Sequence, residues 1–497
     1  MNDFSVASVD QLDVTNNPEI QQQLSQDLHD VKILRSPSFG ALSREESRNN
    51  SVIGSLIDDE LDDDNSGNSE SRSNSVATNS GIRIYTLADM IEALSKPRSK
   101  INTDSRLFLL SLAYKMLIRR PDMANVNEQD MEQLIGYIKT SRSDIEMVLS
   151  IKLASAYGAT DTDEVGTELM DELIPLLFGK IFDFTNSVFL RSNCIAAYFS
   201  LLLVIFDGSD CYSVADNVNG FLELVEGYQS PKNASSESDK DTEFQWDIVA
   251  GSINGICVIL TLLYKSGKND INELIQDCLP RLIPFFGSEF PRKVHKALCI
   301  LIGVMYEAFD YKAEEREEEE EGNDEAGISE GPYYDVEELK MMIGDLSRES
   351  TKKVGKKNKR EVRSIYRDAL RTIEEANKEK DEDEEELDDA DIRVISRFSI
   401  SKNKQVPIRS WFAFVRLIHL KYLFDTELSS HYLYSKEVRE LLARPDEQVE
   451  YDNDDEEVSG VKHWKGRQDK VSGKKKDSRI QRARDRKLLE KMEGLNI

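Results

Sequence analysis

The side chains best placed to do chemistry are Lys and Arg residues between Lys462 and Lys491. This segment holds thirteen basic residues and four acids, so its net charge is 13 − 4 = +9. The whole chain has 64 Lys and Arg against 93 Asp and Glu, a formal net charge of −29. A cationic tail on an anionic body indicates a polyanionic partner, and nucleic acid is the first candidate.

Part of this tail is expected to contact RNA directly. Many cations allow many phosphate contacts, so binding should be strong and should weaken steeply with salt. The stretch from Arg479 to Leu489 has Arg at nearly every second position, which predicts a helix that folds within a phosphate-lined channel. Trp464 could stack on an unpaired base, or equally pack against the protein. The predicted RNA-binding residues are Trp464, Lys465, Arg467, Lys474, Lys475, Lys476, Arg479, Arg482, Arg484, Arg486 and Lys487.

A second basic run, from Lys352 to Arg371, lies between acidic runs at 314–325 and 379–391. The acidic runs are expected to mask it when no polyanion is present. The run also has the length and density of a nuclear import signal, which is compatible with RNA binding. The residues of this second patch or import signal are Lys352, Lys353, Lys356, Lys357, Lys359 and Arg360.

The sequence contains no recognisable catalytic or metal-binding pattern. None of its five histidines stands in a zinc-ligand pairing, and Ser472-Gly473-Lys474-Lys475 lacks the remaining residues of a phosphate loop. The abundant acids lie in low-complexity runs that cannot hold a fixed geometry. The five cysteines occur singly in apolar segments, which indicates reduced, buried thiols. We therefore expect no enzymatic activity, metal or cofactor.

Helices must position these charged segments. From Ile84 to about Tyr311, apolar residues recur at three- and four-residue spacing. The similar segments around Pro175 and Pro284 favour an armadillo/HEAT-like α-solenoid, with a compact helical bundle as the alternative. The longest apolar run, 194–206, falls short of the roughly 20 residues of a membrane helix and is interpreted as core. Helices are expected near 86–95, 104–119, 127–140, 143–157, 167–184, 187–206, 211–227, 244–265, 270–286 and 292–310.

A small α+β module is expected further along the chain. Residues 392–400 alternate apolar and polar as a strand does, and 405–409 form the returning strand. Residues 411–424 have the apolar density of a buried helix, and 435–442 form a short amphipathic one. The module is expected to pack on a helix at 361–376.

The predicted fold is thus mainly α-helical, with flanking disordered segments. Its predicted parts are a disordered Ser-rich head (1–80), an armadillo-like helical domain (81–311), a charged linker (312–358), the C-terminal α+β module (359–445) and a basic tail (446–497).

The head has few aromatic residues and no sustained apolar period, so it cannot bury enough surface to order itself. It shows no secretory signal. Arg followed three residues later by Ser recurs, which favours regulation by basophilic kinases, although both residues are common in disordered segments. The stretch from Arg35 to Gly40 also looks like a 14-3-3 ligand. The phosphorylation candidates are Ser38, Ser47, Ser51 and Ser75.

The segment from Lys359 to Arg371 resembles the basic motif of the interferon-related developmental regulator family. In that family a Lys/Arg cluster leads into Arg-Ser-(Ile/Phe)-(Phe/Tyr)-Arg-Asp-x-Leu-Arg, and residues 363–371 match every position. The pairs Ser410-Trp411 and His431-Tyr432 follow in the family's order. The family's cationic segment just after the Trp is absent here, so the helix starting at Trp411 is expected to be core.

The resemblance implies a non-enzymatic protein that associates with ribosomes, especially translationally idle ones, or that co-regulates transcription through protein contacts. We therefore predict a ribosome-associated factor whose tail enters an rRNA-lined channel and holds the particle inactive. The alternative is a scaffold for chromatin-modifying proteins. The expected partners are the ribosome and rRNA, with chromatin-modifying proteins and 14-3-3 as further candidates, and no membrane. The chain is expected to be monomeric and cytoplasmic, with a nuclear pool allowed by the import signal.

Overall fold

The structure is a computed structural model that describes residues 86–99, 101–119, 125–207, 212–228, 239–266, 271–311, 331–348, 356–376, 394–401 and 404–444. Within these ranges it leaves out the side chains of residues 212–213, 239–243 and 356–362. The predicted head and tail lie outside the described residues. So do the candidate phosphorylation sites and every tail residue assigned to RNA binding.

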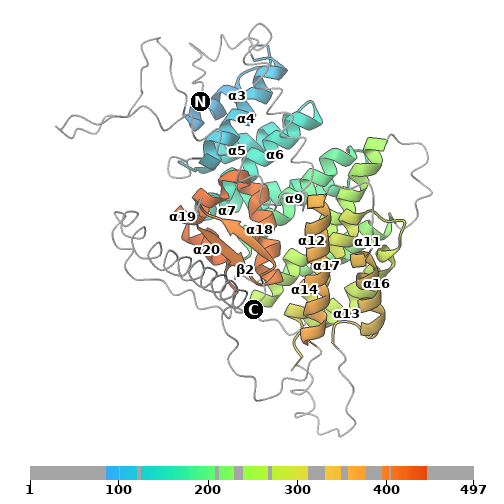
Figure 1. Cartoon of the computed structure of the whole chain (residues 1–497). Helices are drawn as coiled ribbons and strands as arrows, with labels where there is room; N and C mark the ends of the chain where they lie inside the picture. The colour runs from blue at the N-terminus through green and yellow to red at the C-terminus, as the bar shows by residue number, and fades with distance from the viewer. Residues whose placement is uncertain are drawn as a thin grey trace, which may run out of the picture. The chain divides into compact units, whose positions relative to one another are not determined.

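The described residues form a mainly α-helical unit (Figure 1). Several helices begin where a polar side chain accepts a hydrogen bond from a free backbone N–H, as at Thr86, Asn127, Ser143 and Ser187. The first helices are α3 (Leu87–Ser95), α4 (Thr103–Arg119), α5 (Glu128–Thr140), α6 (Asp144–Gly158), α7 (Thr162–Glu168), α8 (Ile174–Phe182) and α9 (Val188–Ile205). They are followed by α10 (Tyr212–Ala215), α11 (Val218–Glu226), α12 (Asp239–Ser266), α13 (Ile271–Leu282) and α14 (Arg292–Ala308).

These helices match most of the predicted ones, although three of the predicted helices are not continuous. The predicted helix at 270–286 is α-helical as α13 up to Leu282 and continues as a 3₁₀ turn at Ile283–Phe286. The predicted helix at 167–184 is interrupted by a π-helical turn at Leu169–Leu173, and α8 then begins with Pro175 in its first turn. Proline cannot donate a backbone hydrogen bond, which explains why the regular pattern breaks just before it. The predicted helix at 211–227 is divided into α10 and α11.

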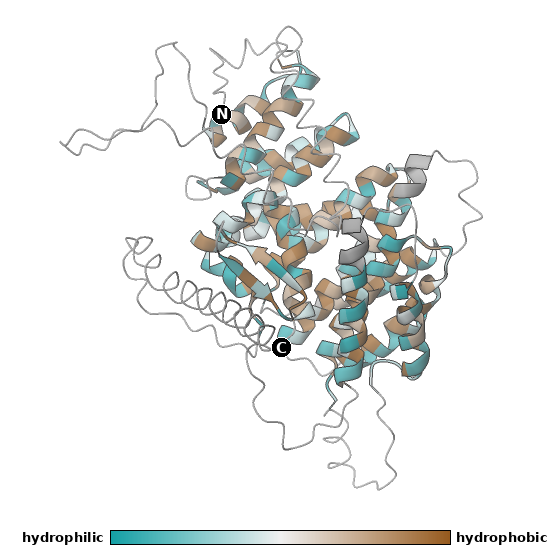
Figure 2. Cartoon of the chain, in the orientation of Figure 1, coloured by the Kyte–Doolittle hydropathy of each residue, from teal (hydrophilic) through white to brown (hydrophobic). Residues whose placement is uncertain are grey.

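A series of long helices forms the centre of the unit: α4 packs on α6, α6 on α9, α9 on α12, and α12 on α14. Apolar residues are concentrated along these helices, whereas the outer side of α17 (Lys356–Ala376) is hydrophilic (Figure 2). Successive packing lets each helix bury residues on more than one face. Leu153, Leu201, Ile256 and Leu301 are all fully buried.

Two helical segments, Val188–Ile205 and Phe244–Ser266, are long and apolar enough to cross a membrane by length and composition. The first of these helices begins before the predicted apolar run at 194–206, which was expected to be too short for a membrane helix. Yet 78% and 89% of these segments are buried against other helices. The interpretation of 194–206 as part of a core helix is confirmed.

The predicted small module is also confirmed in its elements. Strands β1 (Ser396–Ser399) and β2 (Gln405–Ile408) pair antiparallel. The helices that follow are α18 (Trp411–Phe424), α19 (Leu428–Tyr434) and α20 (Lys436–Leu442), with a 3₁₀ turn at Asp425–Glu427 between the first two. Helix α18 packs on α9, α12 and α14, so its apolar sequence serves the core as expected.

The predicted charged linker at 312–358 needs correction, because it contains a folded helix. Helix α16 (Val336–Arg348) packs against α17 and buries Leu339 and Ile343 completely. Apolar residues do recur at helical spacing in this segment, as Val336, Leu339, Ile343 and Leu346, but the charge runs on either side obscure the pattern in the sequence.

A buried lysine joins α6 to α18. The side chain of Lys152 donates a hydrogen bond to the carbonyl of Tyr422, and its Nζ lies 3.9 Å from the ring centroid of that tyrosine. The Tyr114 ring of α4 lies 5.4 Å away on another side. Burial lowers the pKa of Lys152 from 10.5 to about 8, against a smaller opposing effect of Asp425.

Lys152→Met should remove a pH-dependent cost of folding. Below pH 8 the lysine is charged in both states, so the cost of burying the charge is fully present, and it fades as the pH rises towards 10.5. Between pH 7.5 and 9.5 the wild type should therefore gain about 2 kcal/mol relative to the variant in its free energy of unfolding. Denaturant titrations of both proteins measure this difference. Parallel stability curves would contradict a buried charge at Lys152.

Candidate nucleic-acid interface

Helix α17 carries the basic motif and has two chemically different faces. Its inner face buries Ile365, Tyr366, Ala369 and Ile373, each at most 4% exposed, against α14 and α16. One face of the motif therefore packs into the core. The arginines of the motif lie on the opposite face.

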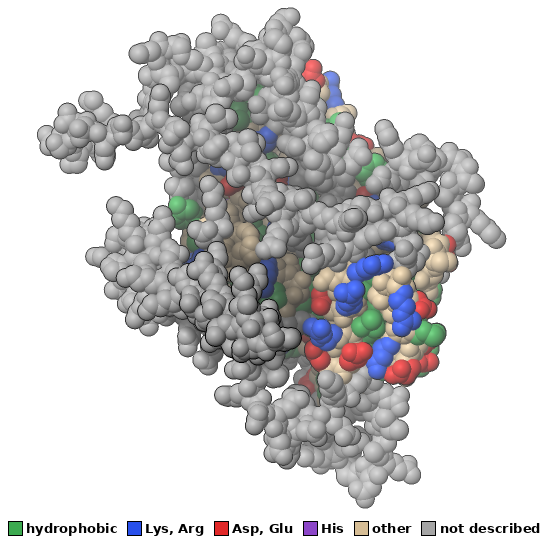
Figure 3. Space-filling view, viewed as in Figure 1, with side chains coloured by type: hydrophobic (Ala, Val, Ile, Leu, Met, Phe, Trp, Pro, Cys, Tyr) green, Lys and Arg blue, Asp and Glu red, His purple; other side chains and the backbone are tan. Residues whose placement is uncertain are grey.

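The outer face carries a row of arginines. Arg367 and Arg371 are exposed and Arg363 is partly exposed, at a spacing of four residues that places them one turn apart, about 5.4 Å along the helix. None of the three forms an ion pair with another described residue. On the face where α16 and α17 lie, several Lys and Arg side chains are visible, with Asp and Glu side chains among them (Figure 3).

The helical register extends this row towards the start of α17. Positions 356 and 360 continue the spacing of 363, 367 and 371, and position 359 borders the row. Lys356, Lys359 and Arg360 of the predicted second patch thus lie in the same helix as the three arginines. We call the row Lys356, Lys359, Arg360, Arg363, Arg367 and Arg371 the α17 cationic row.

The start of α18 fixes α17 from the inside. Trp411 is fully buried, and its Nε1–H donates to Oγ1 of Thr372 over 2.8 Å. The indole lies against Gly303 of α14, where an added Cβ would come within 2.4 Å of the ring. Glycine at this position therefore permits the close contact among α14, α17 and α18.

A carboxylate from α14 anchors the same helix start. Glu307 accepts hydrogen bonds from the backbone N–H groups of Trp411, at 2.8 Å and 2.9 Å, and of Phe412, at 3.1 Å. Ser410 caps the helix through its Oγ, which accepts from the N–H of Ala413 at 3.1 Å. An anion at a helix N-terminus is favoured by the helix dipole. The Ser-Trp pair thus has a structural role in holding α17.

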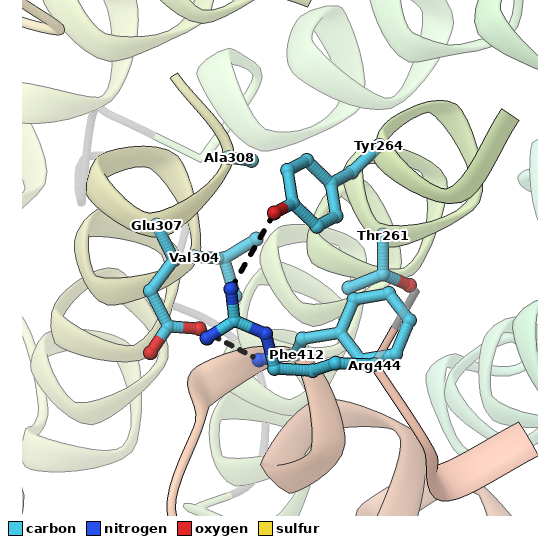
Figure 4. Close-up of a pocket in the computed structure, with 7 residues that line it drawn as sticks. All are labelled: Thr261, Tyr264, Val304, Glu307, Ala308, Phe412 and Arg444. Carbon is cyan, nitrogen blue, oxygen red and sulfur yellow. Dashed lines mark hydrogen bonds between the residues drawn. The ribbon is translucent and has the colours of Figure 1, made fainter. Parts of the chain in front are cut away.

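A small pocket lies beside this junction, and polar side chains that line it form hydrogen bonds within the fold (Figure 4). Glu307 is engaged by α18 as above, and Arg444 Nη2 lies 3.4 Å from the Tyr264 hydroxyl. The cavity volume open to a water-sized molecule is only about 10 Å³, about enough for one water molecule. Its lining residues are Thr261, Tyr264, Val304, Glu307, Ala308, Phe412 and Arg444.

The described histidines of the small module are core residues. His419 Nδ1 lies 3.0 Å from the Ser200 hydroxyl, and burial lowers the pKa of His419 to about 3. His431 Nε2 lies 3.0 Å from the carbonyl of Ile118, and burial lowers the pKa of His431 to about 4. Both rings are therefore neutral at physiological pH.

Four of the five cysteines, Cys194, Cys257, Cys278 and Cys299, are buried free thiols, as predicted. Burial raises the pKa of Cys194 and of Cys278 to about 12, so these thiols stay protonated. Cys211 lies outside the described residues. Across the described ranges, no group of three or more His, Cys, Asp or Glu side chains is placed to hold a metal ion.

The structure thus describes only part of the predicted site. Lys352 and Lys353 lie outside the described residues. Lys356, Lys357, Lys359 and Arg360 form the first turns of α17, although their side chains are not described. The prediction stopped at Arg360 and left out Arg363, Arg367 and Arg371. The helical spacing of these arginines, opposite a buried apolar face, could have identified them.

Comparisons with known proteins agree with the motif. A protein of Schizosaccharomyces pombe, named only as uncharacterized, is 26% identical over 402 residues, which cover 76% of this chain and 80% of that protein. The family model described as interferon-related developmental regulator matches residues 54–374, well over half of the chain, and this range includes the whole motif of α17. The chain therefore belongs to the interferon-related developmental regulator family.

Proposed function

We propose that this protein is a non-enzymatic RNA-binding factor that associates with ribosomes and holds them in a translationally inactive state. The observation that carries the proposal is the α17 cationic row, in which Arg367 and Arg371 are exposed and Arg363 is partly exposed, opposite the buried face that fixes the helix. A rigid row of guanidinium groups can contact successive phosphates of one RNA strand. The +9 tail supplies further phosphate contacts.

The predicted roles of the cationic segments and of the rest of the chain follow from their opposite charges. The chain as a whole is strongly anionic, so most of its surface should repel rRNA, whereas the row and the tail attract it. The serial packing of α4, α6, α9, α12 and α14 supports an armadillo-like arrangement as the scaffold. Cytoplasmic localisation belongs to this proposal, and an import signal in the second basic run would add a nuclear pool.

Removing three charges from the row tests this proposal. The variant Arg363→Gln/Arg367→Gln/Arg371→Gln should bind ribosomes or an A-form RNA duplex more weakly, and the slope of log K against log salt should become shallower by about 2 to 3. The measurement is a binding titration at several salt concentrations. The matched control, Arg119→Gln/Lys139→Gln/Lys436→Gln, removes three cations that are ion-paired elsewhere. Equal slopes for the two variants would refute a specific role of α17.

A further inference from the structure

Arg367 and Arg371 of the α17 cationic row are exposed among the described residues, and a strongly acidic segment follows them in the same chain. Helix α17 ends at Ala376, and the segment from Glu379 to Asp391 follows after two residues. It contains ten acidic residues and one lysine, a net charge of 1 − 10 = −9. Such opposite charges in one chain attract each other at low salt.

We infer that the acidic segment 379–391 binds the α17 cationic row when RNA is absent and competes with RNA for it. The inference concerns the regulation of the proposed RNA-binding face. The intramolecular contact itself does not depend on that function, but its consequence for RNA binding does.

The chain is long enough for this contact. Seventeen residues lie between Ala376 and Val394, where the described chain resumes, and they can span at most about 56 Å. The far end of the row, position 356, lies 20 residues and about 30 Å from Ala376 along the helix. An extended segment is therefore long enough to pass every cation of the row.

Tethering makes the contact effective although single exposed ion pairs are weak. A segment joined directly to the helix is present at an effective concentration in the millimolar range. Ten carboxylates opposite six cations also allow many alternative pairings. A short or weakly charged RNA should fail to displace the segment, whereas a dense array of phosphates, with the tail as a second anchor, should displace it. The acidic segment would thus select for highly structured RNA such as rRNA.

The second acidic run, 314–325, serves as an internal comparison. It has nine acids and one arginine, so its charge is nearly the same. It precedes α16 rather than α17, and it is joined to the row through a longer path. A general electrostatic field would make the two runs equivalent, whereas specific binding to the row makes 379–391 dominant.

Zero-length carbodiimide crosslinking of the full-length protein without RNA tests the contact directly. Amines at positions 356, 357 and 359 should couple to carboxylates of 379–391, and 500 mM salt should abolish these crosslinks. Lys139, which pairs with Glu172, provides a reference crosslink within the described fold. If the three lysines couple to 314–325 as often as to 379–391, or to neither run, the inference is overturned.

RNA affinity gives the second readout. Changing the ten acids of 379–391 to Asn and Gln should strengthen binding to a 12-base-pair RNA duplex by about tenfold at 50 mM salt, within the usual range of coupling between sites. The gain should disappear at high salt, and the same change at 314–325 should have a much smaller effect. Equal gains would overturn the inference. Crosslinks to 379–391 together with normal RNA binding after removal of the α17 arginines would instead refute the proposed function.

Discussion

Arg416→Ala should lower the free energy of unfolding by about 3–5 kcal/mol, because it removes one partner of a buried ion pair. The Arg416 side chain of α18 is completely buried, and its Nη1 lies 2.5 Å from Oδ1 of Asp207, just after α9. It also donates to the carbonyls of Thr261 and Leu441, each at 3.1 Å. Its guanidinium lies 3.9 Å from the ring centroid of Phe412.

The variant removes one hydrogen-bond donor from each of these acceptors within the core. Asp207 keeps only Lys265 as a described ion-pair partner, at 2.5 Å. Because Arg416 connects α18 to α9, α12 and α20, its loss should also loosen the start of α18 and, through Trp411, the support of α17. Denaturant unfolding measures the stability loss.

Arg281→Ala is the appropriate control. Its ion pair with Glu226 is partly exposed, with side chains 26% and 32% accessible, so its removal should cost about 1 kcal/mol or less. If Arg416→Ala lowers the free energy of unfolding by less than about 1 kcal/mol, the predicted large cost of breaking the Arg416–Asp207 ion pair is contradicted.

Truncation after Val461 should have the largest effect on RNA binding. It removes a segment of net charge +9 within 462–491 and all tail residues predicted to contact RNA. A protein that makes six to ten phosphate contacts loses about 10³ to 10⁵ in affinity between 50 and 200 mM salt, and removing most of these contacts should flatten that dependence. The truncated protein should therefore bind ribosomes at least about 100-fold more weakly at 100 mM salt.

A tail in which every Lys and Arg is exchanged for the other residue separates charge from sequence. This variant should keep most of the affinity if phosphate attraction dominates, and it should lose affinity if fixed guanidinium geometry is required. A truncated protein that binds as tightly as the intact chain at every salt concentration would refute the role of the tail.

Much of the fold could be predicted from the sequence, because the spacing of apolar residues indicates which face of a helix or strand is buried. Alternation predicted a strand over 392–400, within which β1 lies, and apolar density predicted the buried helix at 411–424. Helix α16 was missed because its apolar residues lie between charge runs that favoured a linker. The π-helical turn before Pro175 was missed because propensity does not determine how a proline is accommodated.

The site could be predicted only in part. The motif was recognisable as a string of residues, but the bond between Trp411 and Thr372 joins positions 39 residues apart, and a single sequence gives no signal for such a contact. The buried ion pair of Arg416 with Asp207, 209 residues away, was hidden for the same reason. Local patterns identify faces, whereas long-range partners are determined by tertiary packing.

The most direct test of the account is sedimentation of the intact protein with ribosomes from starved cells on sucrose gradients of increasing ionic strength. The account predicts that the protein migrates with the ribosomal fractions at low salt and moves to the light fractions as salt rises. If it remains in the light fractions even at low salt, ribosome association through phosphate contacts is contradicted.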